Sequence, residues 1–185
     1  EENQERQKVT VATIEATMNK LTPVMQAMVR IQLATAMRPS EIHRMTPAQI
    51  DRSGEVWIYR PTSHKNVNKG KARAIPIIGD ALEALTPYVF GDPEELCFVT
   101  SKGSPWDKDN YRREITKAAK AAKVAHWAPY SIRHLTLQTV RDAQGPEGAQ
   151  ALAGHSHLNM TERYAKASEL KAIEAARVAP RLANG

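Results

Sequence analysis

The segment 152–164, LAGHSHLNMTERY, carries the side chains of this chain that are best suited to chemistry. It contains two histidines, and Tyr164 follows His155 by nine positions. A tyrosine phenol is a poor nucleophile near neutral pH, because its unperturbed pKa is about 10. It becomes effective when cationic groups hold an anionic substrate against it and stabilise the charge that develops. The segment therefore predicts a nucleophilic tyrosine, provided that the rest of the chain supplies such groups.

Four residues in separate parts of the sequence are our candidates for those groups: Arg38, Lys65, Arg133 and His155. Arg38 lies at a corner, because Pro39 interrupts a long apolar helix and a short helix begins near Ser40. Glu41 follows one turn later, and we expect it to orient Arg38. An arginine in this place is also typical of a simple C-terminal helix cap, so the short motif alone leaves both interpretations open.

A lysine-rich hairpin follows the first arginine. The alternating segment 55–60 (EVWIYR) predicts a strand, and 72–78 (ARAIPII) predicts its antiparallel partner. The polar segment between them places four cations on or near the tip: Lys65, Lys69, Lys71 and Arg73. Such residues often only protect a sheet edge. We expect Lys65 to enter an anion site, because it ends the first strand where the backbone is best held, although the spacing does not settle which lysine reacts.

The remaining elements predict one mainly α-helical domain with a small antiparallel β-sheet. The hairpin forms the sheet, with 96–99 as a candidate third strand. Residues 1–9 are charged and aperiodic, which indicates a tail or linker remnant before a domain over 10–182. Helices are predicted over 11–20, from Pro23, over 40–45, 79–88 and 111–123, from Pro129, over 146–152 and over 168–178. The last of these is amphipathic, and its apolar face could pack on its own domain or on a neighbouring copy.

The charge of the chain favours an anionic partner. The formal net charge is +6 and the pI is near 9.5, which is typical of nucleic-acid binding without proving it. The predicted helix 111–123 has five basic residues against one glutamate. A charge run is usually a solvated face, but this excess also suits a helix that contacts DNA phosphates.

Other features limit the class of protein. The single cysteine, Cys97, fits a reducing compartment. No apolar run reaches the roughly 18 residues of a membrane span, and the polar start lacks a signal peptide, so we expect a cytoplasmic protein. His155 and His157, with His126 or His134, suggest a metal site, but the usual carboxylate or cysteine companions are missing. We therefore expect no metal and no cofactor.

Taken in order, the motifs resemble those of the tyrosine recombinases, the phage integrases and their relatives. ATAMRPSEI resembles the first arginine box of that family. YSIRHLTLQT resembles the second box, usually written His-x-x-Arg-His, and LAGHSHLNMTERYAKAS resembles the Leu-Gly-His segment with its tyrosine nine residues later. The resemblance covers about 9–178. This chain departs from the pattern at Ala36 (commonly glycine), at Tyr130 (commonly histidine) and at the extra Ala153.

The resemblance implies the fold of the family's catalytic domain and its chemistry on DNA. Arg38 and Arg133 would clamp the scissile phosphate, and Tyr164 would attack it to give a 3′-phosphotyrosine. Lys65 would protonate the leaving 5′ oxygen, and His155 would hydrogen-bond the phosphate or assist proton removal. Tyr130 would donate a hydrogen bond but carry no charge.

The same resemblance implies partners. Further contacts to double-stranded DNA would come from six residues: Lys69, Lys71, Arg73, Arg112, Arg113 and His134. A tetramer would form on DNA in the nucleoid, with the helix 168–182 docked on a neighbouring protomer, and a DNA-binding domain would precede this chain. Two alternatives use the same residues: a DNA-binding module of this fold without catalysis, and topoisomerase-like nicking and closing.

Overall fold

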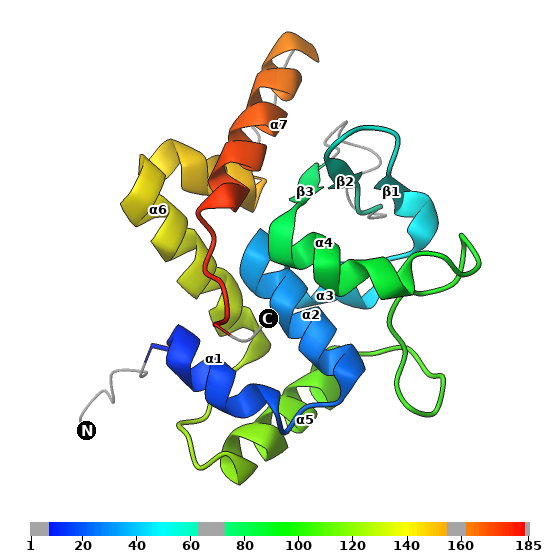
Figure 1. Cartoon of the computed structure of the whole chain (residues 1–185), viewed down its shortest axis with the longest axis vertical. Helices are drawn as coiled ribbons and strands as arrows, with labels where there is room; N and C mark the ends of the chain where they lie inside the picture. Colours follow the sequence, from blue (N-terminus) through cyan, green and yellow to red (C-terminus); the bar gives the residue numbers. More distant parts are fainter. Residues whose placement is uncertain (1–7, 63–72, 155–161, 184–185) are drawn as a thin grey trace.

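The computed structural model describes residues 8–62, 73–154 and 162–183, with only the backbone of 162–165. Over these residues the protein is mainly helical with one small antiparallel sheet (Figure 1), which confirms the predicted fold class. The helices are α1 (Val11–Met18), α2 (Pro23–Thr35), α3 (Pro39–His43), α4 (Gly79–Leu85), α5 (Lys108–Ala121), α6 (Pro129–Ala153) and α7 (Glu162–Arg177). Two 3-10 turns, η1 (Pro47–Gln49) and η3 (Thr86–Tyr88), and the strands β1 (Ile50–Asp51), β2 (Trp57–Tyr59) and β3 (Ile75–Ile77) complete the fold.

Helix α2 passes through the middle of the domain and packs against α4 and α6 (Figure 1). Thr22 caps it, since its hydroxyl accepts the N–H of Met25 at 3.4 Å, and Pro23 occupies the first position as predicted. Most of its side chains are buried, because apolar residues cover almost every face. This buried helix therefore gives a fixed base to the corner that follows it.

The sheet has the order β1-β2-β3, all antiparallel, with Trp57 opposite Ile77 and Tyr59 opposite Ile75. The predicted hairpin pairing is thus confirmed. The third strand is Ile50–Asp51, and the expectation that 96–99 would be a strand of this sheet is wrong. That run is held elsewhere, because the Cys97 N–H donates to the Met45 carbonyl at 2.8 Å and Phe98 is buried in the core.

The two helices predicted from Pro129 and over 146–152 are the two parts of α6, which is broken at Gly145. Gly145 has φ 78° and ψ 178°, a conformation that is essentially restricted to glycine. The chain therefore runs up one arm from Pro129, turns at Gly145 and returns along a second arm to Ala153 (Figure 1). The helix ends at Gly154 in the left-handed conformation, with φ 70°.

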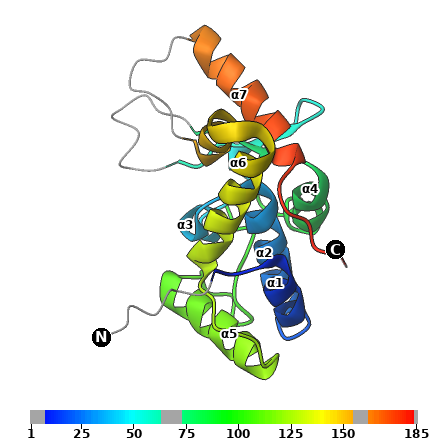
Figure 2. The same cartoon turned by 90° about the vertical axis from the view of Figure 1, so that its left-hand side faces the viewer.

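Helix α7 differs from the sequence expectation. A helix over 168–178 was predicted, but the helix begins earlier, at Glu162. Its buried face consists of Ala172, Ala175 and Ala176, whereas Leu170 is exposed, so small residues make the close contact with α6 and β3. The first turns of α7 extend beyond the rest of the domain (Figure 2). No helix in the described parts of the chain is long and apolar enough to span a bilayer.

His43 is the last residue of α3 and is buried against Tyr111 of α5, with the two rings edge to face at 5.0 Å. The pKa of His43 is lowered to about 4, mainly by burial; the charge of Asp107 opposes the shift and that of Arg44 contributes to it. The imidazole is therefore neutral in the folded protein at neutral pH.

This shift predicts how acid affects stability. Because the folded-state pKa lies below the unfolded value, the contribution of His43 is complete above about pH 6.5 and is lost as the pH falls toward 4. Between pH 7.5 and 4.5 we expect His43 to account for about 2–3 kcal/mol of lost unfolding free energy. Urea unfolding of His43→Phe, which keeps an aromatic ring, should show a correspondingly shallower pH dependence over this range; equal slopes in both proteins would contradict the assignment.

Candidate active site

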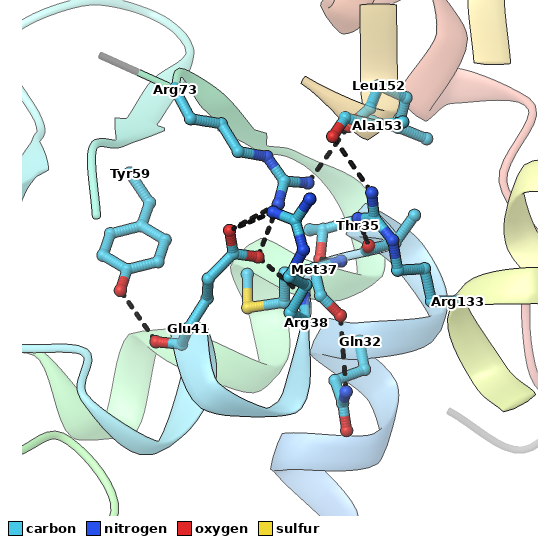
Figure 3. A network of polar contacts seen from close by, with 11 residues as sticks. Gln32, Thr35, Met37, Arg38, Glu41, Tyr59, Arg73, Arg133, Leu152 and Ala153 are labelled. Carbon is cyan, nitrogen blue, oxygen red and sulfur yellow. Dashed lines mark hydrogen bonds and ion pairs between the residues drawn. The ribbon is translucent and has the colours of Figure 1, made fainter. Parts of the chain in front are cut away.

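The first candidate arginine lies where α2 gives way to α3 (Figure 3). Ala36 ends α2 in the left-handed conformation, with φ 54°, and Arg38 is extended before Pro39 begins α3. An L residue in that conformation costs about 1–2 kcal/mol. The methyl group of Ala36 is fully buried beside Val140 and Leu152, and this burial offsets part of the cost where the family commonly has glycine.

Glu41 holds this corner in place. Its carboxylate accepts the backbone N–H of Arg38 at 2.6 Å and the Arg38 Nη1 at 3.1 Å. Its backbone carbonyl accepts the Tyr59 hydroxyl at 2.7 Å, which ties α3 to β2. Arg38 keeps 40% of its side chain exposed, whereas Glu41 is nearly buried. The carboxylate therefore orients a guanidinium that remains accessible to a ligand.

Arg133 comes from the first arm of α6 and is 3% exposed. It donates through Nη1 to the Ala36 carbonyl and through Nη2 to the Ala153 carbonyl at 3.0 Å. Its pKa is lowered to about 10, mainly by burial and also by the charges of Arg73 and Arg38, while Glu41 opposes the shift. The side chain remains a cation at neutral pH and joins the corner of α2 to the end of α6.

Arg73 belongs to the same cluster, which the sequence did not predict. Its side chain is 8% exposed, with Nη1 2.5 Å from both carboxylate oxygens of Glu41 and Nη2 3.2 Å from the Leu152 carbonyl. This burial contradicts the expectation that Arg73 contacts DNA from the hairpin tip. The available signal was its position directly before the apolar strand Ile75–Ile77, at the inner end of the hairpin.

A pocket of about 670 Å³ adjoins Arg38. Its walls are largely apolar and include Pro39, Trp106 and Tyr111. Four basic residues also line it: Arg38, Arg44, Lys108 and Arg112. Tyr130 also lines it, 47% exposed, with its ring edge to face with that of His134 at 5.3 Å. Arg38 thus borders a largely apolar pocket that other basic residues also line.

The structure describes only some of the candidate residues. Lys65, Lys69, Lys71 and His155 fall outside the described residues, as does the suggested pair of His155 and His157. Tyr164 lies in the first turn of α7, where only the backbone is described. Arg112 and Arg113 are exposed on α5, and His134 is exposed on α6. Within the described residues, no three His, Cys, Asp or Glu side chains gather as a metal site would require.

The sequence of this chain is similar to those of known recombinases. The tyrosine recombinase XerC of Corynebacterium efficiens is 28% identical over 160 residues, covering 83% of this chain and 49% of that protein. XerC of Corynebacterium glutamicum is 29% identical over 157 residues, covering 80% and 48%. The chain therefore spans about half the length of the curated relatives it matches.

Solved structures share the fold. The XerA recombinase superposes with a TM-score of 0.66 at 15% identity, covering 92% of this chain and 65% of that one. The Tn1549 transposon integrase in complex with circular intermediate DNA gives 0.64 at 18% identity, covering 92% and 68%. A lambda integrase dimer bound to a core site gives 0.64 at 16%, covering 87% and 62%. The model of the phage integrase family matches residues 5–171, and the chain, as its three motifs indicated, belongs to that family.

Proposed function

We propose that this chain is the catalytic part of a site-specific DNA recombinase or integrase that cleaves and rejoins strands through a 3′-phosphotyrosyl intermediate. The observation that carries the proposal is the cluster of Arg38, Arg73 and Arg133 around the single carboxylate of Glu41. Three guanidiniums and one carboxylate leave an excess of positive charge at a partly open corner. A DNA phosphodiester supplies the missing anion.

Arg38 and Arg133 are the phosphate ligands in this proposal. The exposed part of Arg38 meets a nonbridging oxygen. Arg133 uses two of its five N–H groups on the carbonyls of Ala36 and Ala153, and another N–H binds a nonbridging oxygen. Guanidinium groups held in this way stabilise the charge that grows at phosphorus in the transition state. Tyr130 adds a neutral hydrogen bond.

The proposed reaction exchanges one phosphate ester for another. The Tyr164 oxygen forms a bond to phosphorus while the bond from phosphorus to the 5′ oxygen breaks. Lys65 gives a proton to that oxygen as general acid, and His155 binds the phosphate or takes the tyrosine proton. A free 5′-hydroxyl then attacks the phosphotyrosine and releases Tyr164, so that neither step needs a nucleotide cofactor or a metal.

The DNA-facing surface would extend from this corner along α5. Arg112 and Arg113 are exposed there, with His134 nearby on α6, and Lys69 and Lys71 would add contacts from the hairpin. Salt-dependent phosphate binding follows from such a surface. We further propose assembly as a homo-oligomer, a tetramer, on DNA in the nucleoid of the cytoplasm, together with an N-terminal DNA-binding domain in the full-length protein.

One face of α7 is buried against its own domain, so only the exposed face of this helix is available to a neighbouring protomer. Ala172, Ala175 and Ala176 are already buried in the chain's own domain. Leu170 is exposed and lies toward the part of α7 that extends outward. Within the expected docking segment 168–182, the proposed contact therefore belongs to the outer face near Leu170.

The nucleophile is tested with a pool of short duplexes of random sequence. Each duplex carries a nick, so that cleavage a few nucleotides from the nick releases a short fragment. This fragment diffuses away, which prevents religation and traps the covalent adduct. Wild-type protein should trap a covalent DNA adduct on a denaturing gel, and Tyr164→Phe should lose it while binding the recovered sequence with an unchanged dissociation constant. Tyr88→Phe, a half-buried tyrosine in η3, is the matched control and should keep the adduct. An adduct in Tyr164→Phe, or none in the wild type, would refute the proposal.

The general acid is tested with a better leaving group. Lys65→Ala should slow cleavage of an ordinary phosphodiester by about 10²–10⁴-fold but spare a substrate with a 5′-phosphorothiolate, because a thiolate leaves without a proton. Lys171→Ala, which removes a surface lysine paired with Glu147, should change neither rate. Equal losses of Lys65→Ala on both substrates, or selective rescue of Lys69→Ala or Lys71→Ala instead, would move the role away from Lys65.

A further inference from the structure

Arg73 occupies the point where three segments of the chain meet, and the reaction outlined above gives it no role. It lies at the inner end of the hairpin before β3, it binds Glu41 of α3, and it donates to the Leu152 carbonyl at the end of α6. Figure 3 shows its guanidinium between Glu41 and the end of α6, beside that of Arg38. Because Glu41 also binds Arg38, Arg73 is one contact away from the exposed arginine.

Arg73 and Arg133 divide the end of α6 between them. The last carbonyls of a helix have no partner within the helix and carry the negative end of its dipole. Arg73 takes the Leu152 carbonyl, and Arg133 takes the Ala153 carbonyl. Both guanidiniums thus anchor the turn that leads directly to Gly154 and His155.

Gly154 fits Arg73 closely. A Cβ at this position would lie 2.6 Å from Nε, 2.7 Å from Cδ and 2.8 Å from Cγ of Arg73, far inside van der Waals contact. The positive φ of 70° already favours glycine here. A side chain at position 154 is therefore excluded both by the clash with Arg73 and by the positive φ. Only the clash disappears when Arg73 is replaced by alanine.

Stability alone does not account for a buried arginine in this place. Desolvation of a buried ion pair often cancels its Coulombic gain, and apolar residues of similar volume are often as stable. Arg38 lies close enough to repel Arg73 as well. Arg73 contributes little net stability, but it fixes the hairpin, α3 and the end of α6 relative to one another. We therefore look for its role in the function of the site that these elements form.

We propose that Arg73 is a positioning residue for strand cleavage, which fixes Glu41, and through it Arg38, against the end of α6. This inference rests on the proposed function. The Arg73 side chain is 8% exposed and donates to Glu41 and Leu152, whereas that of Arg38 is 40% exposed, so in this proposal the phosphate is bound by Arg38 rather than by Arg73. Its loss should therefore affect the rate at which bound DNA is cleaved much more than the affinity for DNA.

Cleavage kinetics give the main test, with single-turnover rates and dissociation constants measured on one adduct-forming duplex at a temperature where each variant is folded. Arg73→Ala should slow cleavage about 100-fold and change the dissociation constant less than about threefold. The Arg38→Ala, Arg73→Ala double variant should be little slower than Arg38→Ala, because the one residue acts through the other. Arg73→Lys should fall in between, since an ammonium cannot span Glu41 and Leu152 together.

The matched control is Arg30→Ala, which breaks a partly buried ion pair with Asp80 that joins α2 to α4. It should lower the melting temperature without changing the cleavage rate of the folded protein. If Arg30→Ala slows cleavage as much as Arg73→Ala does, or if the effects of Arg38→Ala and Arg73→Ala multiply, the positioning role is wrong.

Gly154 provides a second test through the predicted clash. Gly154→Ala should slow cleavage strongly in the wild-type background but only a few-fold further in Arg73→Ala, where the arginine no longer opposes the new methyl group. An equal effect of Gly154→Ala in both backgrounds would contradict the close fit.

A readout without DNA separates this inference from the proposed function. Hydrogen exchange of the free protein should accelerate in Arg73→Ala at backbone amides of α3 and of 150–154, with α5 unchanged. Unchanged exchange at both places would overturn the anchoring role even if the wild type cleaves DNA. If exchange accelerates in Arg73→Ala but the wild type forms no covalent DNA adduct, the anchoring role of Arg73 stands and the proposed cleavage reaction is refuted.

Discussion

The arrangement of the site depends on the carboxylate of Glu41, which is the only anion among the described residues in contact with Arg38 and Arg73. Like charges repel when they are brought together, and the carboxylate offsets this repulsion between Arg38 and Arg73, whereas Arg133 is held by backbone carbonyls. One carboxylate holds two arginines together without neutralising both. The remaining positive charge is what makes the site receptive to a phosphodiester.

The other hydrogen bonds of these arginines go to backbone carbonyls, which leave the positive charge of the guanidinium groups in place. Arg133 donates to Ala36 and Ala153, and Arg73 donates to Leu152. A carbonyl dipole satisfies an N–H and orients a guanidinium without cancelling its charge, whereas a second carboxylate would fix the arginine and remove its use as an anion ligand. The same contacts satisfy helix ends that would otherwise be buried without partners.

Local signals predicted most of the elements, because their causes are local. The helix that starts at Val11, the helix that starts at Pro23, the separate part of α6 from Pro146 and the two strands of the hairpin all follow from neighbouring residues. The two-residue strand β1, the continuous α7 and the burial of Arg73 depend on partners distant in sequence. The three motifs indicated that Arg38 and Arg133 belong together, but no spacing could indicate that an arginine at the inner end of the hairpin shares their carboxylate.

The reversal in α6 explains how distant motifs reach one another. Arg133 and Ala153 are twenty positions apart, and a straight helix would separate them by about 30 Å. They are nevertheless hydrogen-bonded, because the chain turns back at Gly145, whose backbone conformation is available essentially to glycine alone. The second arginine box and the end of α6 at Ala153 are therefore brought together by one helix that is broken at Gly145. An uncharged glycine that forms no hydrogen bond with Arg38 or Glu41 within the described residues thus decides which backbone carbonyl Arg133 can reach.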